Sequence, residues 1–189
     1  IYVAYKDYEW MMEMVEQCLE QIAKDVNGDT KAQVGEHVIE FAGPYERLSM
    51  YDSIKKYTDI DISEMDEAGL RAVCKQLHIE VDDSMGRGKL IDEIFGEKVE
   101  AHLIQPTYIT DYPIEMTPLA KKHRSKEGLV ERFELFVNGK EIANAYSELN
   151  DPIDQRERFE DQLKLAARGD EEAMALDEDF LRSLEYGMP

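Results

Sequence analysis

Hydrophobic side chains recur at helical spacing in the first part of the chain. From residue 7 to residue 26 they follow the i, i+3/4, i+7 pattern of an amphipathic helix, and Asn27-Gly28-Asp29 ends it. The members of this stripe are Met11, Met14, Val15, Cys18, Leu19, Ile22 and Val26. Residues 36–41 have the composition of a strand, and Ser49 is placed to cap a short helix over 50–57.

The character of the chain changes over residues 58–85, which are acidic and polar with short helical stretches. Another helical pattern then covers residues 88–101. We therefore expect three parts. Residues 1–57 and 86–189 belong to one main body, and residues 58–85 form a small helical insertion on it.

Strand-like alternation dominates residues 104–150. Two alternating segments flank Asn138-Gly139, and this arrangement is the strongest short-range signal for a β-hairpin. Asp151-Pro152 then opens a helix that Gly169 ends, and a last helix covers about 177–186. Together these elements predict an α+β fold in which helices flank an antiparallel sheet.

The balance of charge is strongly acidic, because 42 Asp and Glu against 22 Lys and Arg give a formal net charge of −20. Nucleic acid is bound through Lys and Arg, so a contact with it must be confined to a local basic patch. Residues 121–126 form the concentrated basic run of the chain, and we call them the basic loop. The alternative is a solvated surface loop. No apolar run approaches the roughly 20 residues of a membrane span, so no membrane partner is expected.

The two cysteines, Cys18 and Cys74, lie far apart in the sequence and lack the spacing of a zinc site. We expect both to be buried thiols of a protein in the reducing cytoplasm. The four histidines are scattered without a second ligand at i+2 to i+4, so the sequence shows no transition-metal motif.

Carboxylates mark one face of the predicted hairpin. With a two-residue turn, Phe136 lies opposite Glu141. Glu134 then lies opposite Ala143 and shares a face with Glu141. The other, core-facing side would carry Phe133, Leu135, Val137 and Ile142. Two nearby carboxylates are hard oxygen ligands that suit Mg²⁺, which takes one or two of them together with phosphates. The alternative is a solvated acidic surface.

The same hairpin resembles a known family. The segment RFELFVNGKEIANAYSELNDPIDQRERF is similar to the one that precedes motif 3 of class II lysyl-tRNA synthetases. The opening residues 1–8, IYVAYKDY, resemble the tail of that family's motif 2, E-x-Y-x-A-Y-x-D-Y. Residues 116–121 and the segment MGRGKLIDEIFGEKVE are similar to its intervening parts. The resemblance covers essentially the whole chain in order and is weakest over residues 58–85.

The resemblance implies roles for five residues. Glu134 and Glu141 match the glutamates that the family associates with magnesium and ATP. Asn144 and Glu148 match residues that hold the lysine substrate, and Tyr2 matches a motif 2 tyrosine in the same pocket. The chemistry agrees, because a lysine ammonium group requires an anionic partner and a charge-assisted hydrogen bond. A buried carboxylate would also reject an uncharged analogue, which would leave it unpaired.

The reaction that the resemblance implies has two steps. The lysine carboxylate attacks the α-phosphate of ATP and gives lysyl-adenylate and pyrophosphate. The lysyl group then passes to the 3′-terminal ribose of tRNA(Lys), and Mg²⁺ is the implied cofactor. Catalysis would consist of positioning and charge neutralisation without a protein nucleophile, so no residue is assigned as catalytic.

The family also has parts that this sequence does not contain. These are motif 1, which forms its homodimer interface, the arginine of motif 2, the glycine-rich motif 3 and an N-terminal anticodon-binding barrel. We therefore expect the chain to be a piece of a longer cytoplasmic enzyme and to be inactive by itself. The basic loop is then a candidate contact for tRNA or phosphate.

Three alternatives stay open. A synthetase for aspartate or asparagine shares the fold, but its substrate would require an arginine or another polar set in place of Asn144 and Glu148. A lysyl-tRNA synthetase paralogue would attach lysine-like groups to a protein. A non-catalytic acidic interaction module would need none of this chemistry.

Simple alternation conflicts with the implied roles. Glu141 has odd parity and Asn144 and Glu148 have even parity, so a regular strand would place them on opposite faces. One extra residue in the strand removes the conflict, because a β-bulge reverses the alternation. We therefore predict an interruption of regular pairing within residues 142–146, with Glu134, Glu141, Asn144 and Glu148 facing one cleft.

Overall fold

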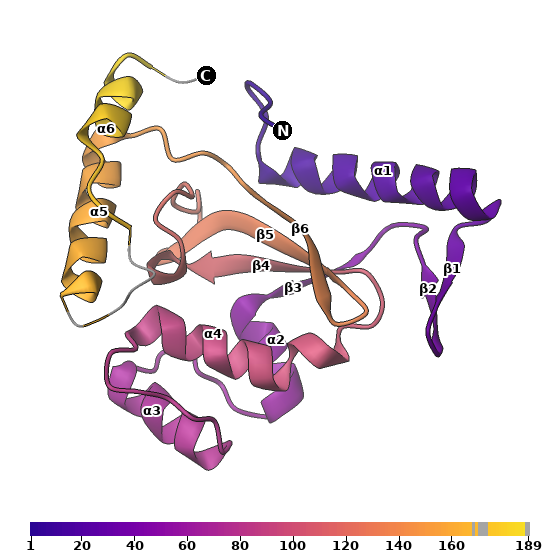
Figure 1. Cartoon of the computed structure of the whole chain (residues 1–189), viewed down its shortest axis with the longest axis horizontal. Coiled ribbons are helices and arrows are strands. Elements are labelled where there is room, and N and C mark those ends of the chain that lie inside the picture. Colours follow the sequence, from indigo (N-terminus) through magenta and orange to yellow (C-terminus); the bar gives the residue numbers. More distant parts are fainter. Residues whose placement is uncertain (168, 170–173, 188–189) are drawn as a thin grey trace.

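The computed structural model describes residues 1–167, 169 and 174–187 (Figure 1). Its α-helices are α1 (Tyr8–Asn27), α2 (Met50–Thr58), α3 (Glu67–Gln76), α4 (Arg87–Lys98), α5 (Pro152–Ala166) and α6 (Glu178–Glu185). Two short 3₁₀ helices are η1 (Glu100–His102) and η2 (Ile114–Met116). The strands are β1 (Lys31–Val34), β2 (His37–Glu40), β3 (Glu46–Ser49), β4 (Thr107–Pro113), β5 (Leu129–Val137) and β6 (Lys140–Tyr146).

The sheet has the order β3-β4-β5-β6. Its β4, β5 and β6 pair antiparallel, as predicted, whereas β3 joins β4 in parallel. The sequence pattern missed β3 and also β1, which pairs with β2 in a separate two-stranded sheet. The α+β class is confirmed, and the sheet is mixed because of one short parallel edge strand.

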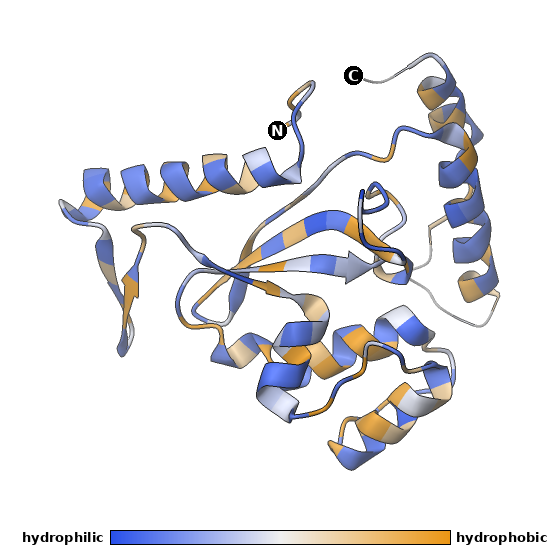
Figure 2. Ribbon diagram, turned by 180° about the vertical axis from the view of Figure 1, so that it is seen from behind, coloured by the Kyte–Doolittle hydropathy of each residue, from blue (hydrophilic) through white to orange (hydrophobic). Residues whose placement is uncertain are grey.

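Two apolar clusters cover the two faces of the sheet. On one face, Tyr8 and Met12 of α1 pack with Tyr108, Phe133 and Leu135. On the other face, buried residues of α2, α3 and α4 pack with residues of β4 and β5. Figure 1 shows this arrangement, with α1 on one side of the sheet and α2 and α4 on the other. Figure 2 shows mostly hydrophilic residues along α5, which lies beyond the end of the sheet.

The predicted helices are confirmed, and local signals account for several of their ends. Asp7 accepts a hydrogen bond from the backbone of Trp10 and caps α1, which Gly28 ends with φ of +74°. The predicted apolar stripe of α1 is only partly buried, because Ile22 and Val26 are exposed. In Figure 1 the second half of α1 extends past the sheet toward β1 and β2, so these positions have no core to face.

The segment 58–85 contains α3, and its apolar residues join the cluster beneath the sheet. Ile62, Leu70 and Cys74 are fully buried with Ile94 of α4. A helical segment is therefore present at the predicted place, and its core is continuous with that of the main body. The division into residues 1–57, 58–85 and 86–189 stays a prediction.

The two cysteines differ. Cys74 is buried, as predicted, but Cys18 is exposed. Cys18 is a member of neither apolar cluster, so its place in the apolar stripe of α1 does not bury it. Among the described residues, no helix combines the length and apolar character needed to cross a bilayer.

Candidate functional site

The hairpin of β5 and β6 turns at the predicted dipeptide. Asn138 and Gly139 have φ of +53° and +66°, the left-handed conformations that a two-residue hairpin turn requires. Their backbone N–H groups donate to the carbonyl oxygens of Ile104 and Leu103, at 2.9 and 3.0 Å. The end of the hairpin is therefore fixed against the segment that leads into β4.

The pairing of β5 with β6 is interrupted within the predicted window. Phe136 pairs with Glu141, but Leu135 pairs with Ala143, so Ile142 is an extra residue in β6. This confirms the predicted β-bulge and corrects two details of the regular register. Glu134 lies opposite Asn144 and not Ala143, and Ile142 is 46% exposed and does not belong to the core.

The bulge places three of the predicted site residues on one face. Residues paired directly across a sheet point to the same side, so Glu141 and Asn144 share the face of Phe136 and Glu134, which is covered by α4. The Asn144 amide donates to Glu134 at 3.3 Å. Glu134 and Glu141 both line a cavity of about 280 Å³, together with acidic residues of α4.

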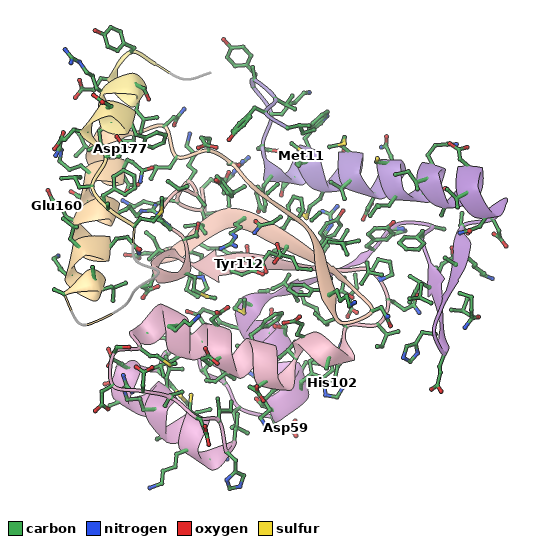
Figure 3. The ribbon with its side chains drawn as sticks, viewed as in Figure 1. Met11, Asp59, His102, Tyr112, Glu160 and Asp177 are labelled. Atoms are coloured by element: carbon green, nitrogen blue, oxygen red, sulfur yellow. The ribbon has the colours of Figure 1, made fainter. Side chains whose placement is uncertain are left out.

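The Glu134 carboxylate has a defined set of neighbours. Tyr112 of β4, at the centre of the sheet in Figure 3, donates its hydroxyl to Oε2 at 2.8 Å. Arg132 forms an ion pair with Oε1. Burial raises the pKa of Glu134, Arg132 and the Tyr112 hydrogen bond oppose that shift, and nearby Glu141 adds to it, with a net rise.

Two cavities meet at this carboxylate. The larger one, of about 720 Å³, lies between α5, the start of α4 and the sheet, and Tyr112, Arg132 and Glu134 line part of it. Its volume is in the range of sites that bind small molecules. Asp92 and Glu134 line both cavities, so the two spaces adjoin.

The donor set fits Mg²⁺ in one specific way. Within the described residues there is no group of three or more His, Cys, Asp or Glu side chains that could enclose a metal ion. Glu134 and Glu141 offer two carboxylates beside one cavity. Mg²⁺ commonly takes one or two carboxylates and completes its shell with water and substrate phosphates. These two residues therefore suit an ion that arrives with a nucleotide.

Glu148 lies further along the chain after β6. Its segment is held by backbone bonds, since Ser147 donates to Glu131 and Leu149 donates to Leu119, at 2.9 and 3.0 Å. The half-buried carboxylate of Glu148 has no hydrogen-bond or ion-pair partner in the part of the chain that the structure describes, and burial raises its pKa. Among the described residues, Glu134 and Glu141 line one cavity, whereas Asn144 and Glu148 line neither of the two cavities, so the prediction that all four face one cleft is not confirmed.

Tyr2, like Glu148, is a predicted site residue that lies outside the cluster of Glu134, Glu141 and Asn144. It is 95% exposed and has no hydrogen bond within the described residues. Burial raises the pKa of Tyr146, and nearby Glu148 and Tyr2 add to the rise. Tyr146 pairs with Arg132 and so lies on the face of Asn144.

Sequence reasoning missed Arg132, Tyr112 and Tyr146. Strand parity could have identified Arg132 and Tyr146, which lie two residues from Glu134 and Asn144 on the same strands. Parity could not have identified Tyr112. The register of β4 against β5 shifts between Thr110 and Tyr112, and no pattern in the sequence predicts that shift.

The cations of the basic loop are all engaged within the chain. Lys121 donates to Asn150 at 2.9 Å, Lys122 pairs with Asp154 at 3.1 Å, and Lys126 pairs with Asp111 at 2.6 Å. Arg124 pairs with Asp7 at 2.9 Å and with Glu131 at 2.5 Å. A contact between this loop and tRNA stays a prediction, and binding would compete with these internal pairs.

Comparisons with known proteins show the family of the chain. The family model described as tRNA synthetases class II (D, K and N) matches residues 1–189. Over all 189 residues, the chain is 65% identical to a lysine–tRNA ligase of Porphyromonas gingivalis and 67% identical to one of Christiangramia forsetii. It is 60% identical to a lysine–tRNA ligase of Azobacteroides pseudotrichonymphae. The chain spans 33% of the first two proteins and 38% of the third.

Proposed function

The chain belongs to the class II tRNA synthetases of the D, K and N group, and from this premise we propose that it is part of a lysine–tRNA ligase. The full-length protein would activate lysine with ATP and transfer it to tRNA(Lys). The proposal draws its substrates from the names of the relatives and its residue roles from the resemblance of the hairpin segment.

The observation that carries the proposal is the Glu148 carboxylate, which has no partner among the described residues. A half-buried carboxylate without a partner is costly, and a cation in the site would remove that cost. The lysine ammonium group supplies such a cation, with hydrogen bonds that a neutral side chain cannot match. Tyr146 lies within electrostatic reach of Glu148 and offers an aromatic wall on the face of Asn144.

The nucleotide would lie at the other end of the site. Glu134 and Glu141 would hold Mg²⁺ there, and the ion, when bound, would neutralise phosphate charge as the lysine carboxylate attacks the α-phosphate. Asn144 lies beside Glu134 and on the same strand region that leads to Glu148, so it would link the two ends. This chain's residues would act by binding and orienting substrates, without a protein nucleophile.

The remaining properties are also proposals. The full-length protein would form a homodimer through its motif 1, as the resemblance implies. It would work in the cytoplasm, where lysine, ATP and tRNA are available together. Two free cysteines, Cys18 and Cys74, agree with a reducing compartment.

ATP–pyrophosphate exchange on the full-length protein tests the proposal. We expect exchange with lysine and none above background with aspartate or asparagine, followed by charging of tRNA(Lys). Exchange with lysine but no charging would favour the paralogue that modifies a protein. No exchange with any amino acid would favour the non-catalytic module.

A substitution of Glu148 tests its proposed role in binding lysine. Glu148→Gln should raise the KM for lysine about 10- to 100-fold, because a hydrogen bond between charged groups is worth about 1.5–3 kcal/mol. Glu178→Gln is the matched control, since Glu178 is exposed and pairs only with Arg156 at the surface. Equal KM values in the two variants would remove Glu148 from the lysine site.

A further inference from the structure

Arg132 contacts several groups at the centre of the site, and its Nη1 also donates to the Met116 carbonyl oxygen at 3.5 Å. Its guanidinium group pairs with Glu134 through Nη2 and donates from Nε to the Asn144 Oδ1 at 3.2 Å. It also lies over the ring of Tyr112, at 4.6 Å from the centroid. Tyr112 in turn donates to Glu134, which accepts from Asn144. Four side chains from three strands are therefore joined in one network.

An irregularity in the sheet makes this network possible. Ile109 and Tyr112 both pack on the α4 side of β4, although their parity differs. The register shift between Thr110 and Tyr112 accounts for this, and Asp111 within it has φ of +57°. Regular alternation would have turned the Tyr112 ring to the opposite face, away from Arg132.

Arg132 fixes which way the Asn144 amide points. Its guanidinium group can only donate hydrogen bonds, so it must face the carbonyl oxygen Oδ1. The Glu134 carboxylate faces the amide nitrogen Nδ2, and it accepts there. One Nδ2 hydrogen and one Oδ1 lone pair remain for a ligand, and both have a set direction. Without Arg132, the single 3.3 Å hydrogen bond to Glu134 would be the remaining contact of this network that orients the amide.

We propose that Arg132, supported by the Tyr112 ring, is a positioning residue that fixes the Asn144 amide for the lysine substrate and ties it to Glu134. The inference rests on the proposed function for the identity of the ligand. The contacts among the four side chains do not depend on that function.

The substitution Arg132→Lys distinguishes the positioning role of Arg132 from a simple ion pair with Glu134. An ammonium group can keep an ion pair with Glu134, but it cannot present parallel donors to Glu134 and Asn144 while it stacks on the Tyr112 ring. Arg132 and Glu134 are only 16% and 13% exposed in their side chains, whereas Asn144 is exposed, so water could occupy the place of the lost donor but would not hold the amide in a fixed direction. Arg132→Lys should therefore keep the fold and weaken the orientation of Asn144.

The test measures lysine binding to the full-length protein by titration calorimetry, without ATP or Mg²⁺. Arg132→Lys should raise the Kd for lysine about tenfold, since one well-placed hydrogen bond is lost. The KM for ATP should change less than twofold, and so should the Kd for lysine in the control Arg156→Lys. In the Asn144→Ala background, Arg132→Lys should add less than a twofold further change.

Full additivity of Arg132→Lys with Asn144→Ala would overturn the inference, and so would an unchanged Kd in Arg132→Lys. Equal losses for lysine and ATP, together with a lower melting temperature, would assign Arg132 to the fold alone and also overturn it. Should the wild type not bind lysine, the proposed function fails by itself. A crystal structure of free Arg132→Lys at a resolution that distinguishes the amide nitrogen from the oxygen then decides the inference, since a rotated or displaced Asn144 amide supports it and an unchanged amide refutes it.

Discussion

Arg124→Gln should destabilise the protein by leaving the buried Glu131 carboxylate without its cation. Glu131 is 3% exposed in its side chain and accepts from Arg124 at both oxygens, from Nε at 2.5 Å and from Nη2 at 2.9 Å. Arg124 also reaches Asp7 at the start of α1. The pair therefore joins the N-terminal helix to β5 across the basic loop.

The magnitude follows from unequal burial of the two partners. Breaking a fully buried ion pair costs about 3–5 kcal/mol, whereas an exposed pair contributes at most about 1 kcal/mol. Arg124 is 56% exposed, so water can approach the stranded carboxylate once the guanidinium group is gone. We expect an intermediate loss of about 2 kcal/mol, or roughly 30-fold in the unfolding equilibrium.

The pH dependence of the unfolding free energy provides an independent check. Burial alone would raise the pKa of Glu131, but the hydrogen bonds from Arg124 and Ser147 and the positive charge of Arg124 together outweigh it and lower the pKa. A lowered pKa in the folded state stabilises the protein above the carboxyl's unfolded value, and this contribution is lost as the pH falls through the folded value. The difference between wild type and Arg124→Gln should therefore shrink as the pH falls below about 4.5.

Urea unfolding of the full-length protein at pH 7 and at pH 4 measures both effects. Glu131→Gln with Arg124→Gln should be no less stable than Arg124→Gln alone, because no charge is then stranded. Arg156→Gln, which breaks an exposed pair, should leave the midpoint unchanged. Additive losses in the double variant, or a loss that does not depend on pH, would refute this account of the pair.

Four further outcomes are expected. Gly88→Ala should cost about 1–3 kcal/mol in urea unfolding, because its Cβ would lie 3.0 Å from a carbonyl oxygen in η2, whereas Gly96→Ala, with open space, should not destabilise. Iodoacetamide should modify the exposed Cys18 well before Cys74, whose burial raises the pKa of its thiol, as peptide mass spectrometry would show. Glu141→Gln should cut ATP–pyrophosphate exchange severely at an unchanged melting temperature, and wild-type rates would exclude its metal role. Neutralising the lysines of the basic loop should flatten the salt dependence of tRNA binding if they contact tRNA, and an unchanged slope would assign them to their internal pairs.

Local chemistry explains the elements that the sequence predicted well. Asp7, Ser49 and Asp177 each cap the helix that follows by accepting from a backbone N–H. Asn138 and Gly139 adopt the left-handed conformations that their dipeptide favours. These signals depend on neighbouring residues alone, so a single sequence is sufficient to find them.

Long-range packing explains the elements that were missed. The strand β3 is four residues long and exists because it pairs with β4, about 60 residues later in the chain. The exposure of Ile22 and Val26 depends on where the sheet ends beneath α1. Neither feature has a local signal, since both are set by the position of a distant element.

Features of both kinds, local and long-range, occur around Glu134. The two strands that flank β5 each depart from regular register close to this residue. On the β6 side, the extra residue Ile142 was predictable, since two chemical roles of opposite parity required it. On the β4 side, the shift near Asp111 was not, because no role had been assigned to Tyr112 that parity would contradict. A period of two therefore predicts the core of this sheet and fails at its site. A departure from regular alternation can be predicted only where the chemistry requires particular side chains to lie on the same face.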